Sequence, residues 1–354
     1  MNDTIHKLQQ EAIELLTKLI AIPSFSKEES GTADAIAEFL KAHAIQSNRS
    51  GNNVWAANKH FNSSKPTLLL NSHHDTVKPN PGYSRDPFKA EIIDGKLYGL
   101  GSNDAGGPLV SLIAAFIYFY DVPDLPYNLV LAATAEEEIS GTGGIESIWL
   151  SLPKIDCAIV GEPTLGQVAV AEKGLMVLDC VAKGKAGHAA REEGVNAIYQ
   201  AFQDIDWFRT YEFPKVSSTL GKIKMSVTVI NAGQAHNQVP VECKFTVDVR
   251  VTDSYTLEEV LEIIKGNVKC EITPRSLRLR SSGIEKNHPL LKAVERMQLK
   301  QYGSPTTSDQ ALIPAASIKL GPGDSARSHS ADEFIYVEEI RKGIDLYIQL
   351  IKNL

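Results

Sequence analysis

Hydrophobic and polar residues alternate along the first half of the chain with two different periods. Residues 5–20 and 32–42 carry apolar side chains three and four positions apart, which is the spacing of one face of an α-helix. Residues 107–119 also predict a helix. Short apolar runs that predict strands lie at residues 54–57, 67–70, 128–133 and 158–160. Strands that alternate with helices favour an α/β fold with a mostly parallel sheet sandwiched by helices.

The pattern changes near residue 174. From there it predicts an α+β unit with a four-stranded antiparallel sheet and two helices on one face. The expected elements are residues 175–181, 195–208, 222–230, 244–251, 256–264 and 268–273. The first pattern then returns, with helices expected over 289–302 and 337–351 and a strand over 317–320. We therefore expect one domain made of residues 1–174 and 281–354, with a second domain, residues 175–280, inserted into it.

Composition excludes several classes of protein. The chain has 354 residues, 43% hydrophobic and 22% charged, as is usual for soluble globular proteins. Its net charge of -7 offers no basic surface for nucleic acid. Residues 108–120 are too few to span a bilayer, and residues 1–6 do not predict a signal peptide. We expect a cytoplasmic protein that binds neither nucleic acid nor membrane, with its four isolated cysteines buried and reduced.

Five segments place a His, Asp or Glu just beyond an apolar run. They are residues 72–75, 101–104, 136–138, 161–163 and 328–330. Each alone has an ordinary interpretation: a structural His, a solvated Glu run, or a helix N-cap at Asp104. In open α/β sheets, however, ligands bind beyond the carboxyl ends of the strands, so the five segments can converge there. His and carboxylate ligands without Cys suit Zn²⁺ in a catalytic site.

These segments, extended to residues 98–104, 160–164 and 321–329, resemble the zinc-dependent amidohydrolase superfamily. That superfamily contains acetylornithine deacetylase, succinyl-diaminopimelate desuccinylase, aminoacylases and glutamate carboxypeptidases. The resemblance covers nearly the whole chain, and it is closest to the first two enzymes. It implies a zinc-exopeptidase-like catalytic domain with an inserted lid and dimerisation domain. It also implies two zinc ions per subunit, with cobalt or manganese as substitutes.

The resemblance also implies roles for the residues of the five segments. Asp104 bridges two ions, and the other implied ligands are His73 and Glu162 on one ion and Glu138 and His329 on the other. Asp75 is implied to orient His73, as carboxylates behind metal-bound imidazoles do. Glu137 is implied to be the general base that faces the attacking water. If the register shifts by one residue, Glu136 takes the role given to Glu137.

Further roles are implied in the inserted domain. His188, in a Gly-rich segment, matches the imidazole that stabilises the tetrahedral oxyanion, sometimes in the neighbouring subunit. Asn237 and Arg250 match positions that contact substrate. A planar guanidinium suits a carboxylate, although an Arg at the end of a strand also suits a surface ion pair.

The glycines at Gly321 and Gly323 lack a Cβ, so their backbone can approach a substrate carboxylate closely. Arg327 is a weaker candidate for the same contact. One departure from the family pattern lies beside Asp104, where residues 105–107 read Ala-Gly-Gly instead of carrying larger side chains. By resemblance, the peptide bond after Asp104 is expected to be cis.

The sequence thus predicts a hydrolase that removes an acetyl or succinyl group from an amino acid. N-acetylornithine or a related arginine- or lysine-pathway intermediate is the expected substrate. A zinc dipeptidase or carboxypeptidase is the alternative, and a non-catalytic zinc-binding module is disfavoured because all candidate ligands and Glu137 are present. A dinucleotide site lacks its third Gly, and no Gly-x-Ser-x-Gly motif supports a serine hydrolase. A homodimer through the inserted domain is expected, because pairing would cover an exposed edge strand.

Overall fold

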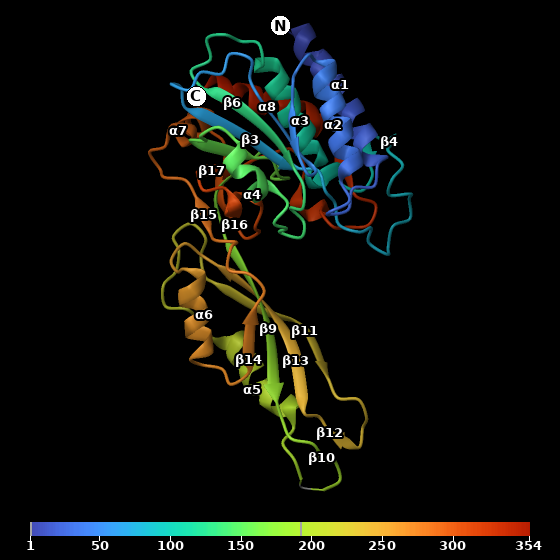
Figure 1. Cartoon of the computed structure of the whole chain (residues 1–354), viewed down its shortest axis with the longest axis vertical. Coiled ribbons are helices and arrows are strands. Elements are labelled where there is room, and N and C mark those ends of the chain that lie inside the picture. Colours follow the sequence, from blue (N-terminus) through green and yellow to red (C-terminus); the bar gives the residue numbers. More distant parts are fainter. Residues whose placement is uncertain (1, 192) are drawn as a thin grey trace. The chain divides into compact units, whose positions relative to one another are not determined.

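The computed structural model describes residues 2–191 and 193–354, and it divides into two compact units. The larger unit runs to Val170 and resumes over Gly283–Tyr302 and Ser308–Leu354. The smaller unit comprises Ala171–Ser282 and Gly303–Thr307 (Figure 1). The sequence placed the boundaries near residues 174 and 280, and it had assigned residues 303–307 to the main domain.

The central sheet has nine strands, of which the four in the middle run parallel. These four, in spatial order, are β6 (Asn128–Thr134), β3 (Thr67–His73), β7 (Cys157–Val160) and β17 (Ala316–Lys319). The outer strands are β1 (Asn48–Ser50), β2 (Asn53–Ala57), β8 (Val168–Glu172), β15 (Ser282–Gly283) and β16 (Gln301–Ser304). The mixed α/β fold with a mostly parallel sheet, as the hydrophobic pattern predicted, is confirmed.

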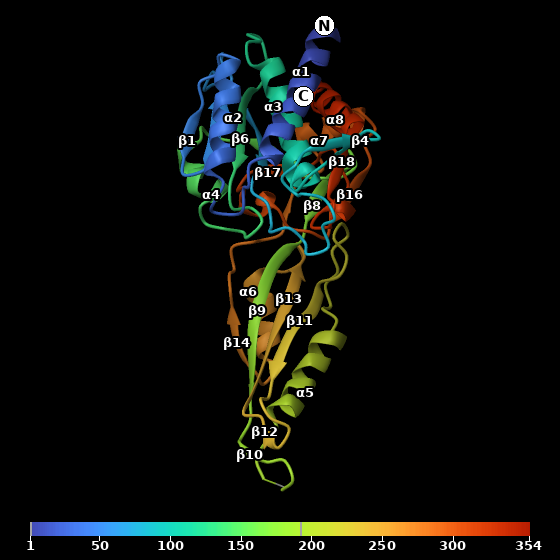
Figure 2. The same ribbon diagram turned by 90° about the vertical axis from the view of Figure 1, so that its right-hand side faces the viewer.

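Helices cover the two faces of this sheet unequally. Successive residues of a strand face opposite sides, so Leu68 and Leu70 of β3 pack in one hydrophobic cluster and Leu69 in another. The first cluster contains α1 (Asn2–Ile20), α2 (Ser30–Ala42), α3 (Gly107–Phe119), α7 (Pro289–Arg296) and α8 (Val337–Lys352). The second contains α4 (Ile145–Ile148) and the 3-10 helices η2 (Trp149–Ser151) and η3 (Asp309–Leu312). Figure 2 shows α1, α2, α3 and α8 in the larger unit.

A small antiparallel sheet in the larger unit joins two segments that are distant in sequence. It consists of β4 (Glu91–Ile93), β5 (Lys96–Tyr98) and β18 (Phe334–Tyr336). Phe334 pairs with Tyr98 in its register. The residues just before β18 therefore lie beside the residues just after β5, which lead to Asp104.

The smaller unit has an antiparallel sheet of four strands. In spatial order they are β11 (Lys224–Ala232), β13 (Glu242–Val251), β9 (Gly174–Lys183) and β14 (Glu271–Pro274). Alternate residues of β9 and β13 form one hydrophobic cluster with α5 (Ala197–Thr210) and α6 (Leu257–Lys265). Both helices therefore cover the same face of the sheet. A separate two-stranded ladder pairs β10 (Gly187–His188) with β12 (Gln238–Val239).

The bounds of most expected elements shift by a few residues in the structure, and two elements are shorter than expected. The helix expected over residues 289–302 ends at Arg296, because Gln298 adopts a φ of 55° and the chain then forms β16. The strand expected over 268–273 begins only at Glu271. The four cysteines are free and buried, as predicted.

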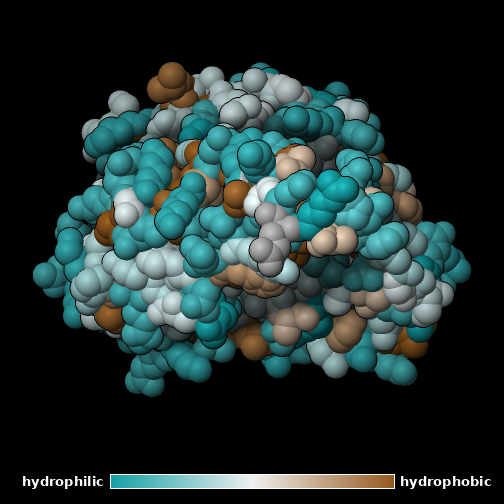
Figure 3. Space-filling view, turned by 90° about the horizontal axis from the view of Figure 1, so that it is seen from below, coloured by the Kyte–Doolittle hydropathy of each residue, from teal (hydrophilic) through white to brown (hydrophobic). Residues whose placement is uncertain are grey.

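The described part of the chain contains no helix that is both long and apolar enough to cross a membrane. The face shown in Figure 3 is mostly hydrophilic, and its apolar side chains occur in small groups.

Candidate active site

Three parallel strands deliver candidate residues to one edge of the central sheet. His73 is the last residue of β3 and pairs in register with Thr134, the last residue of β6. The acidic run of residues 136–138 follows directly after β6. Glu162 follows β7, and the Gly161 N–H between them donates to the Asn71 carbonyl of β3 at 2.7 Å. The convergence that the sequence predicted thus arises from the parallel register of these strands.

His73 is buried, and its Nε2 faces three carboxylates. The nearest oxygens belong to Asp104 at 3.3 Å, Glu162 at 3.8 Å and Glu137 at 3.9 Å. The other ring nitrogen, Nδ1, lies 3.0 Å from the carbonyl oxygen of Asp75. Because a carbonyl only accepts, Nδ1 carries the hydrogen in this contact, and Nε2 is the nitrogen that faces the carboxylates. This is the orientation that a metal-binding imidazole requires.

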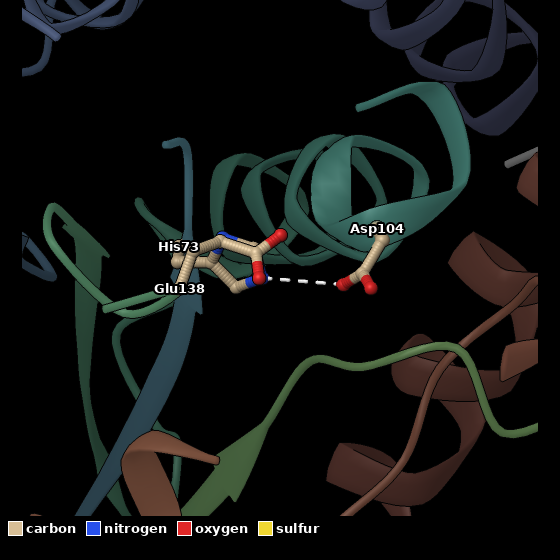
Figure 4. A group of neighbouring side chains, drawn as sticks. All are labelled: His73, Asp104 and Glu138. Carbon is tan, nitrogen blue, oxygen red and sulfur yellow. Dashed lines mark hydrogen bonds and ion pairs between the residues drawn. The ribbon is translucent and has the colours of Figure 1, made fainter. Parts of the chain in front are cut away.

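His329, from the segment before α8, approaches Asp104 and a further carboxylate, Glu138. Its Nε2 lies 2.9 Å from Glu138 Oε2 and 3.7 Å from Asp104 Oδ2. Asp104 therefore turns one carboxylate oxygen toward His73 and the other toward His329. Figure 4 shows Asp104 facing His73 and Glu138 across the cluster.

Among the residues that the structure describes, two sets of three side chains place one potential ligand atom each within 4.8 Å of one another. One set is His73, Asp104 and Glu138, and the other is His73, Glu137 and Glu162. The family resemblance implies two sets of metal ligands that share Asp104, whereas these two sets share His73. Glu137, the expected base, lies next to the expected ligand Glu162.

The electrostatics of the cluster fit a bound cation. Burial raises the pKa of Glu137 well above its ordinary value, and the nearby Glu162 and Glu138 charges raise it further. Burial likewise raises the pKa of Glu162 to about 8, with Asp104 contributing. Burial alone would lower the pKa of His73, but the surrounding carboxylates raise it well above its usual value. Imidazole and carboxylate donors suit zinc, and a cation would stabilise the crowded negative charges. The residues present therefore fit a metal centre.

Asp75 supports both the imidazole and the acidic run. Its buried carboxylate accepts hydrogen bonds from the Glu137 N–H at 3.0 Å and the Glu138 N–H at 3.2 Å. The Ser26 hydroxyl donates to the same carboxylate at 2.6 Å, and His73 Nδ1 lies 3.5 Å from it. Burial alone would raise the pKa of Asp75, but the bonds from His73 and Ser26 lower it. Asp75 thus holds His73 and the loop of Glu137 in one arrangement.

Glu136 turns away from the cluster. Its φ is 56°, and its carboxylate accepts the Gly143 N–H at 3.2 Å. Its own N–H donates to the buried carboxylate of Glu29 at 3.2 Å. The alternative register, in which Glu136 takes the role of Glu137, therefore has no support in the structure.

Asp104 lies in an irregular turn at the start of α3, the π-helical segment η1 (Ser102–Gly106). The peptide bond between Asp104 and Ala105 is cis, as expected. A Cβ on Gly106 would lie 2.5 Å from Leu16 Cδ1, so the Ala-Gly-Gly sequence allows α1 to pack closely against this turn. The small residues that depart from the family pattern therefore have a packing role.

Two buried carboxylates beside the site were not found from the sequence. Glu333 accepts three backbone N–H groups from the turn that carries Asp104. Asp309, in η3, accepts the Thr134 hydroxyl at 2.6 Å, and burial raises its pKa to about 6. Glu333 follows another acid in a short polar segment, and Asp309 follows a Thr-Thr-Ser run. Both sequences are typical of solvated loops and gave no signal of burial.

The candidate residues of the inserted domain lie in the smaller unit and are not part of the cluster. His188, in β10, is exposed, and its Nδ1 accepts the Ala190 N–H at 3.1 Å. Asn237 is also exposed, and its carbonyl accepts the Ala189 N–H at 3.0 Å. The ladder of β10 and β12 thus holds His188 and Asn237 close together.

Both candidate arginines are already paired. Arg250 makes two hydrogen bonds to Asp248, at 2.8 and 2.9 Å, and a third to the Thr307 hydroxyl at 3.2 Å. Arg327 makes two hydrogen bonds to Glu339, at 2.8 and 2.6 Å. Arg250 shows the ion-pair arrangement that its position also suggested, and Arg327 anchors α8.

The two candidate glycines pack against neighbouring loops. The Gly321 N–H donates to the Thr164 hydroxyl at 3.0 Å, so this amide already has a partner within the protein. Gly323 has a φ of 88°, and a Cβ there would lie 2.6 Å from Asn103 Oδ1. The structure gives both glycines a packing role that accounts for the missing side chains.

Comparison with known proteins identifies the family. Residues 69–353 match the model of peptidase family M20/M25/M40. The chain belongs to this family. An acetylornithine deacetylase from Shigella sonnei is 30% identical over 96% of this chain and 97% of its own length. Enzymes of the M20 family are metal-dependent hydrolases, in agreement with the cluster around His73.

Solved structures of the M20 family share the fold. A tripeptidase from Staphylococcus aureus superposes with a TM-score of 0.79 and 20% identity, covering 97% of this chain and 98% of its own. An M20 metallo-carboxypeptidase from Sulfolobus solfataricus gives 0.76 and 18%, with the same coverage. At this identity the likeness concerns the fold.

Proposed function

We propose that this chain is a metal-dependent amidohydrolase that removes an acetyl or succinyl group from an amino acid. The expected substrate is N-acetylornithine or a related intermediate of arginine or lysine metabolism. The observation that carries the proposal is the meeting of five candidate ligands with one additional carboxylate, Glu137, at one sheet edge. The 30% identity to an acetylornithine deacetylase over almost the whole chain supports the substrate class.

We assign the metal centre to zinc, with two ions per chain and with cobalt or manganese as substitutes. The ligands would be His73, Asp104 and Glu162 for one ion, and Asp104, Glu138 and His329 for the other. The bridging role of Asp104 is supported by its two carboxylate oxygens, which face different imidazoles. Bound zinc would polarise the scissile carbonyl and lower the pKa of the attacking water.

Glu137 is the proposed general base. Its carboxylate accepts a proton from the water as the water oxygen attacks the carbonyl carbon. The same carboxyl group then donates that proton to the amine nitrogen as the C–N bond breaks. Asp75 contributes by fixing the backbone N–H of Glu137.

The smaller unit would supply contacts to the substrate. His188 is the proposed donor to the oxyanion, because its imidazole is exposed and does not belong to the metal cluster. Asn237 and Arg250 are the proposed contacts to the amino-acid part of the substrate. Arg250 would have to exchange part of its pairing with Asp248 for the substrate carboxylate. The backbone of Gly321 and Gly323 is the other proposed contact to the substrate carboxylate, and the Gly321 amide would likewise have to exchange its bond to Thr164.

The smaller unit also has the surface that a homodimer would need. On α5, Tyr199 and Phe202 are 66% and 57% exposed. On β11, an edge strand of the four-stranded sheet, Val229 and Ile230 are about half exposed. Pairing of two chains across a two-fold axis would cover these side chains and the edge strand.

A zinc dipeptidase or carboxypeptidase is the second candidate. The same cluster would hydrolyse a peptide bond as readily as an acyl amide, and an M20 carboxypeptidase shares the fold. The difference between the two activities lies in the group that the pocket accepts on the amine side and on the acyl side.

A substrate panel tests the proposal. The zinc-loaded protein is assayed with N-acetyl and N-succinyl forms of ornithine, citrulline, lysine and diaminopimelate, and with unblocked dipeptides. We expect one N-acyl amino acid to exceed every dipeptide in kcat/KM by at least about 100-fold, or roughly 2.7 kcal/mol of transition-state binding. Equal or faster hydrolysis of the dipeptides would reject the deacylase in favour of the peptidase.

A further inference from the structure

The segment that follows His329 contains a deeply buried carboxylate, Glu333, which is 2% exposed. Glu333 Oε1 accepts the N–H groups of Asn103 at 2.8 Å and Asp104 at 2.9 Å. Its Oε2 accepts the N–H of Gly101 at 3.2 Å. The backbone carbonyl of Glu333 also accepts the Gly99 N–H at 3.0 Å. One residue therefore binds four amides of the turn that leads to Asp104.

These four amides lie in an irregular turn, and their N–H groups are not paired within a helix or a sheet. Gly101 has a φ of 73°, and Asp104 has φ and ψ values of -117° and 99°, outside the helical range. In such a turn the direction of the Asp104 side chain is set by whatever binds the neighbouring peptide groups. Here that group is the Glu333 carboxyl group, whose two oxygens accept three of the four N–H groups.

Glu333 lies four residues after His329 in the sequence. The strand β18, which begins at Phe334, pairs with β5, which ends at Tyr98. The backbone that carries His329 and the turn that carries Asp104 are therefore joined by a strand pairing and by the Glu333 side chain. Asp104 Oδ2 and His329 Nε2 are 3.7 Å apart in this arrangement.

We propose that Glu333 is a positioning residue that sets Asp104 and His329 in their metal-binding arrangement before an ion binds. It does not face the reacting atoms, and it acts through the backbone of Asp104. This inference rests on the metal centre of the proposed function and is independent of the substrate.

An ordinary buried carboxylate that stabilises the fold is the competing explanation, and the chain contains a matched example. Asp204, in α5 of the smaller unit, is 4% exposed and accepts the N–H groups of Lys269 at 3.0 Å and Cys270 at 2.8 Å. It resembles Glu333 in burial and in binding backbone amides, but the amides that it binds do not belong to the turn that carries Asp104. If Glu333 only stabilised the fold, variants of Glu333 and of Asp204 would both lose stability, and neither would lose zinc affinity for another reason.

The test measures zinc affinity in the full-length protein. Metal-free wild type, Glu333→Gln and Asp204→Asn are titrated with Zn²⁺ in competition with a chromophoric chelator, and the melting temperature of each metal-free protein is recorded. We expect Glu333→Gln to weaken zinc binding by about 10- to 100-fold, as changes behind metal ligands do. Asp204→Asn is expected to change the melting temperature without changing the zinc affinity.

A double-mutant cycle tests whether Glu333 acts through Asp104. In the Asp104→Asn background, Glu333→Gln should cause little further loss of zinc affinity. If Glu333→Gln does not fold, Glu333→Asp replaces it, because this variant keeps the charge and withdraws the oxygens by one methylene. The expected zinc affinity of Glu333→Asp lies between that of the wild type and that of Glu333→Gln.

The inference would be overturned if Glu333→Gln or Glu333→Asp were less stable than the wild type but bound zinc equally well. It would also be overturned if Glu333→Gln lowered the zinc affinity by the same factor in the wild-type and Asp104→Asn backgrounds. No substrate is present in the titration, so a wrong substrate assignment leaves the result unchanged. Failure of the wild type itself to bind zinc would instead contradict the proposed function.

Discussion

Identical side chains in the acidic run have different surroundings. Glu136 bonds to a backbone amide outside the cluster, Glu137 faces His73, and Glu138 pairs with His329. The difference arises because the φ of 56° at Glu136 turns the chain, and because Asp75 binds the next two amides. From the sequence, the composition of the run was visible, but the choice between Glu136 and Glu137 required these tertiary contacts.

The role of Glu137 leads to a direct prediction. Glu137→Gln should lower kcat by about 10²- to 10⁴-fold, since the amide cannot accept the proton. Its zinc content should match the wild type. Steady-state kinetics and metal analysis on the same preparation check both expectations.

Glu136→Gln is the matched control, and it should retain activity close to the wild type. Full activity in Glu137→Gln would remove this residue from the mechanism. An inactive wild type with normal zinc content would favour the non-catalytic binding module.

Asp309 predicts a pH dependence of stability. Its pKa is raised from 3.8 to about 6 by burial, so the folded protein holds a proton that the unfolded chain releases at lower pH. The stabilisation from this proton is complete below about pH 4 and is lost as the pH rises to about 6. Asp309→Asn, which stays neutral, should therefore gain stability relative to the wild type between pH 4 and pH 7.

Thermal unfolding of both metal-free proteins across this range measures the effect. A difference in melting temperature that does not vary with pH would show that Asp309 titrates at its ordinary value in the folded state.

At the scale of elements, continuous apolar runs were sufficient to predict the elements that are buried on nearly all sides. Strands β3, β6 and β7 and helix α3 lie where the apolar runs predicted them, so His73, the acidic run and Glu162 lie at or just after the ends of three strands. The turn around Asp104 and the pairing of β5 with β18 could not be predicted in this way. They depend on contacts such as the one from Asn103 to Glu333, which are 230 residues apart.

Two glycines with nearly equal φ angles allow the cost of the left-handed backbone to be separated from the cost of steric crowding in the Asp104 turn. Gly101 has a φ of 73°, and a Cβ there would lie 2.5 Å from Thr76 Cγ2. Gly95, between β4 and β5, has a φ of 75° and nothing within 4 Å. Gly95→Ala should cost about 1–2 kcal/mol of unfolding free energy, from the left-handed conformation alone. Gly101→Ala should cost about 1–3 kcal/mol more, because the methyl group is also crowded.

Denaturant unfolding of the two variants compares these costs. Equal losses would mean that the Asp104 turn yields to the added methyl group and is not rigidly packed.

At the scale of the whole molecule, the smaller unit is expected to mediate dimerisation. Light scattering should give twice the mass of one chain for the wild type. Phe202→Glu should shift the protein toward the monomer, because a charge would enter the buried interface. Leu150→Glu is the control, since Leu150 lies in the larger unit and is 97% exposed. An active wild-type monomer would reject the dimer and any role of His188 in a neighbouring subunit.

The dependence of hydrolysis on metal tests the central claim most directly. The protein is stripped with a chelator, its metal content is measured, and hydrolysis of N-acetylornithine and N-succinylornithine is followed before and after zinc is restored. We predict that activity disappears with the metal and returns as up to two zinc ions bind per chain. Undiminished hydrolysis by the metal-free protein would contradict the account.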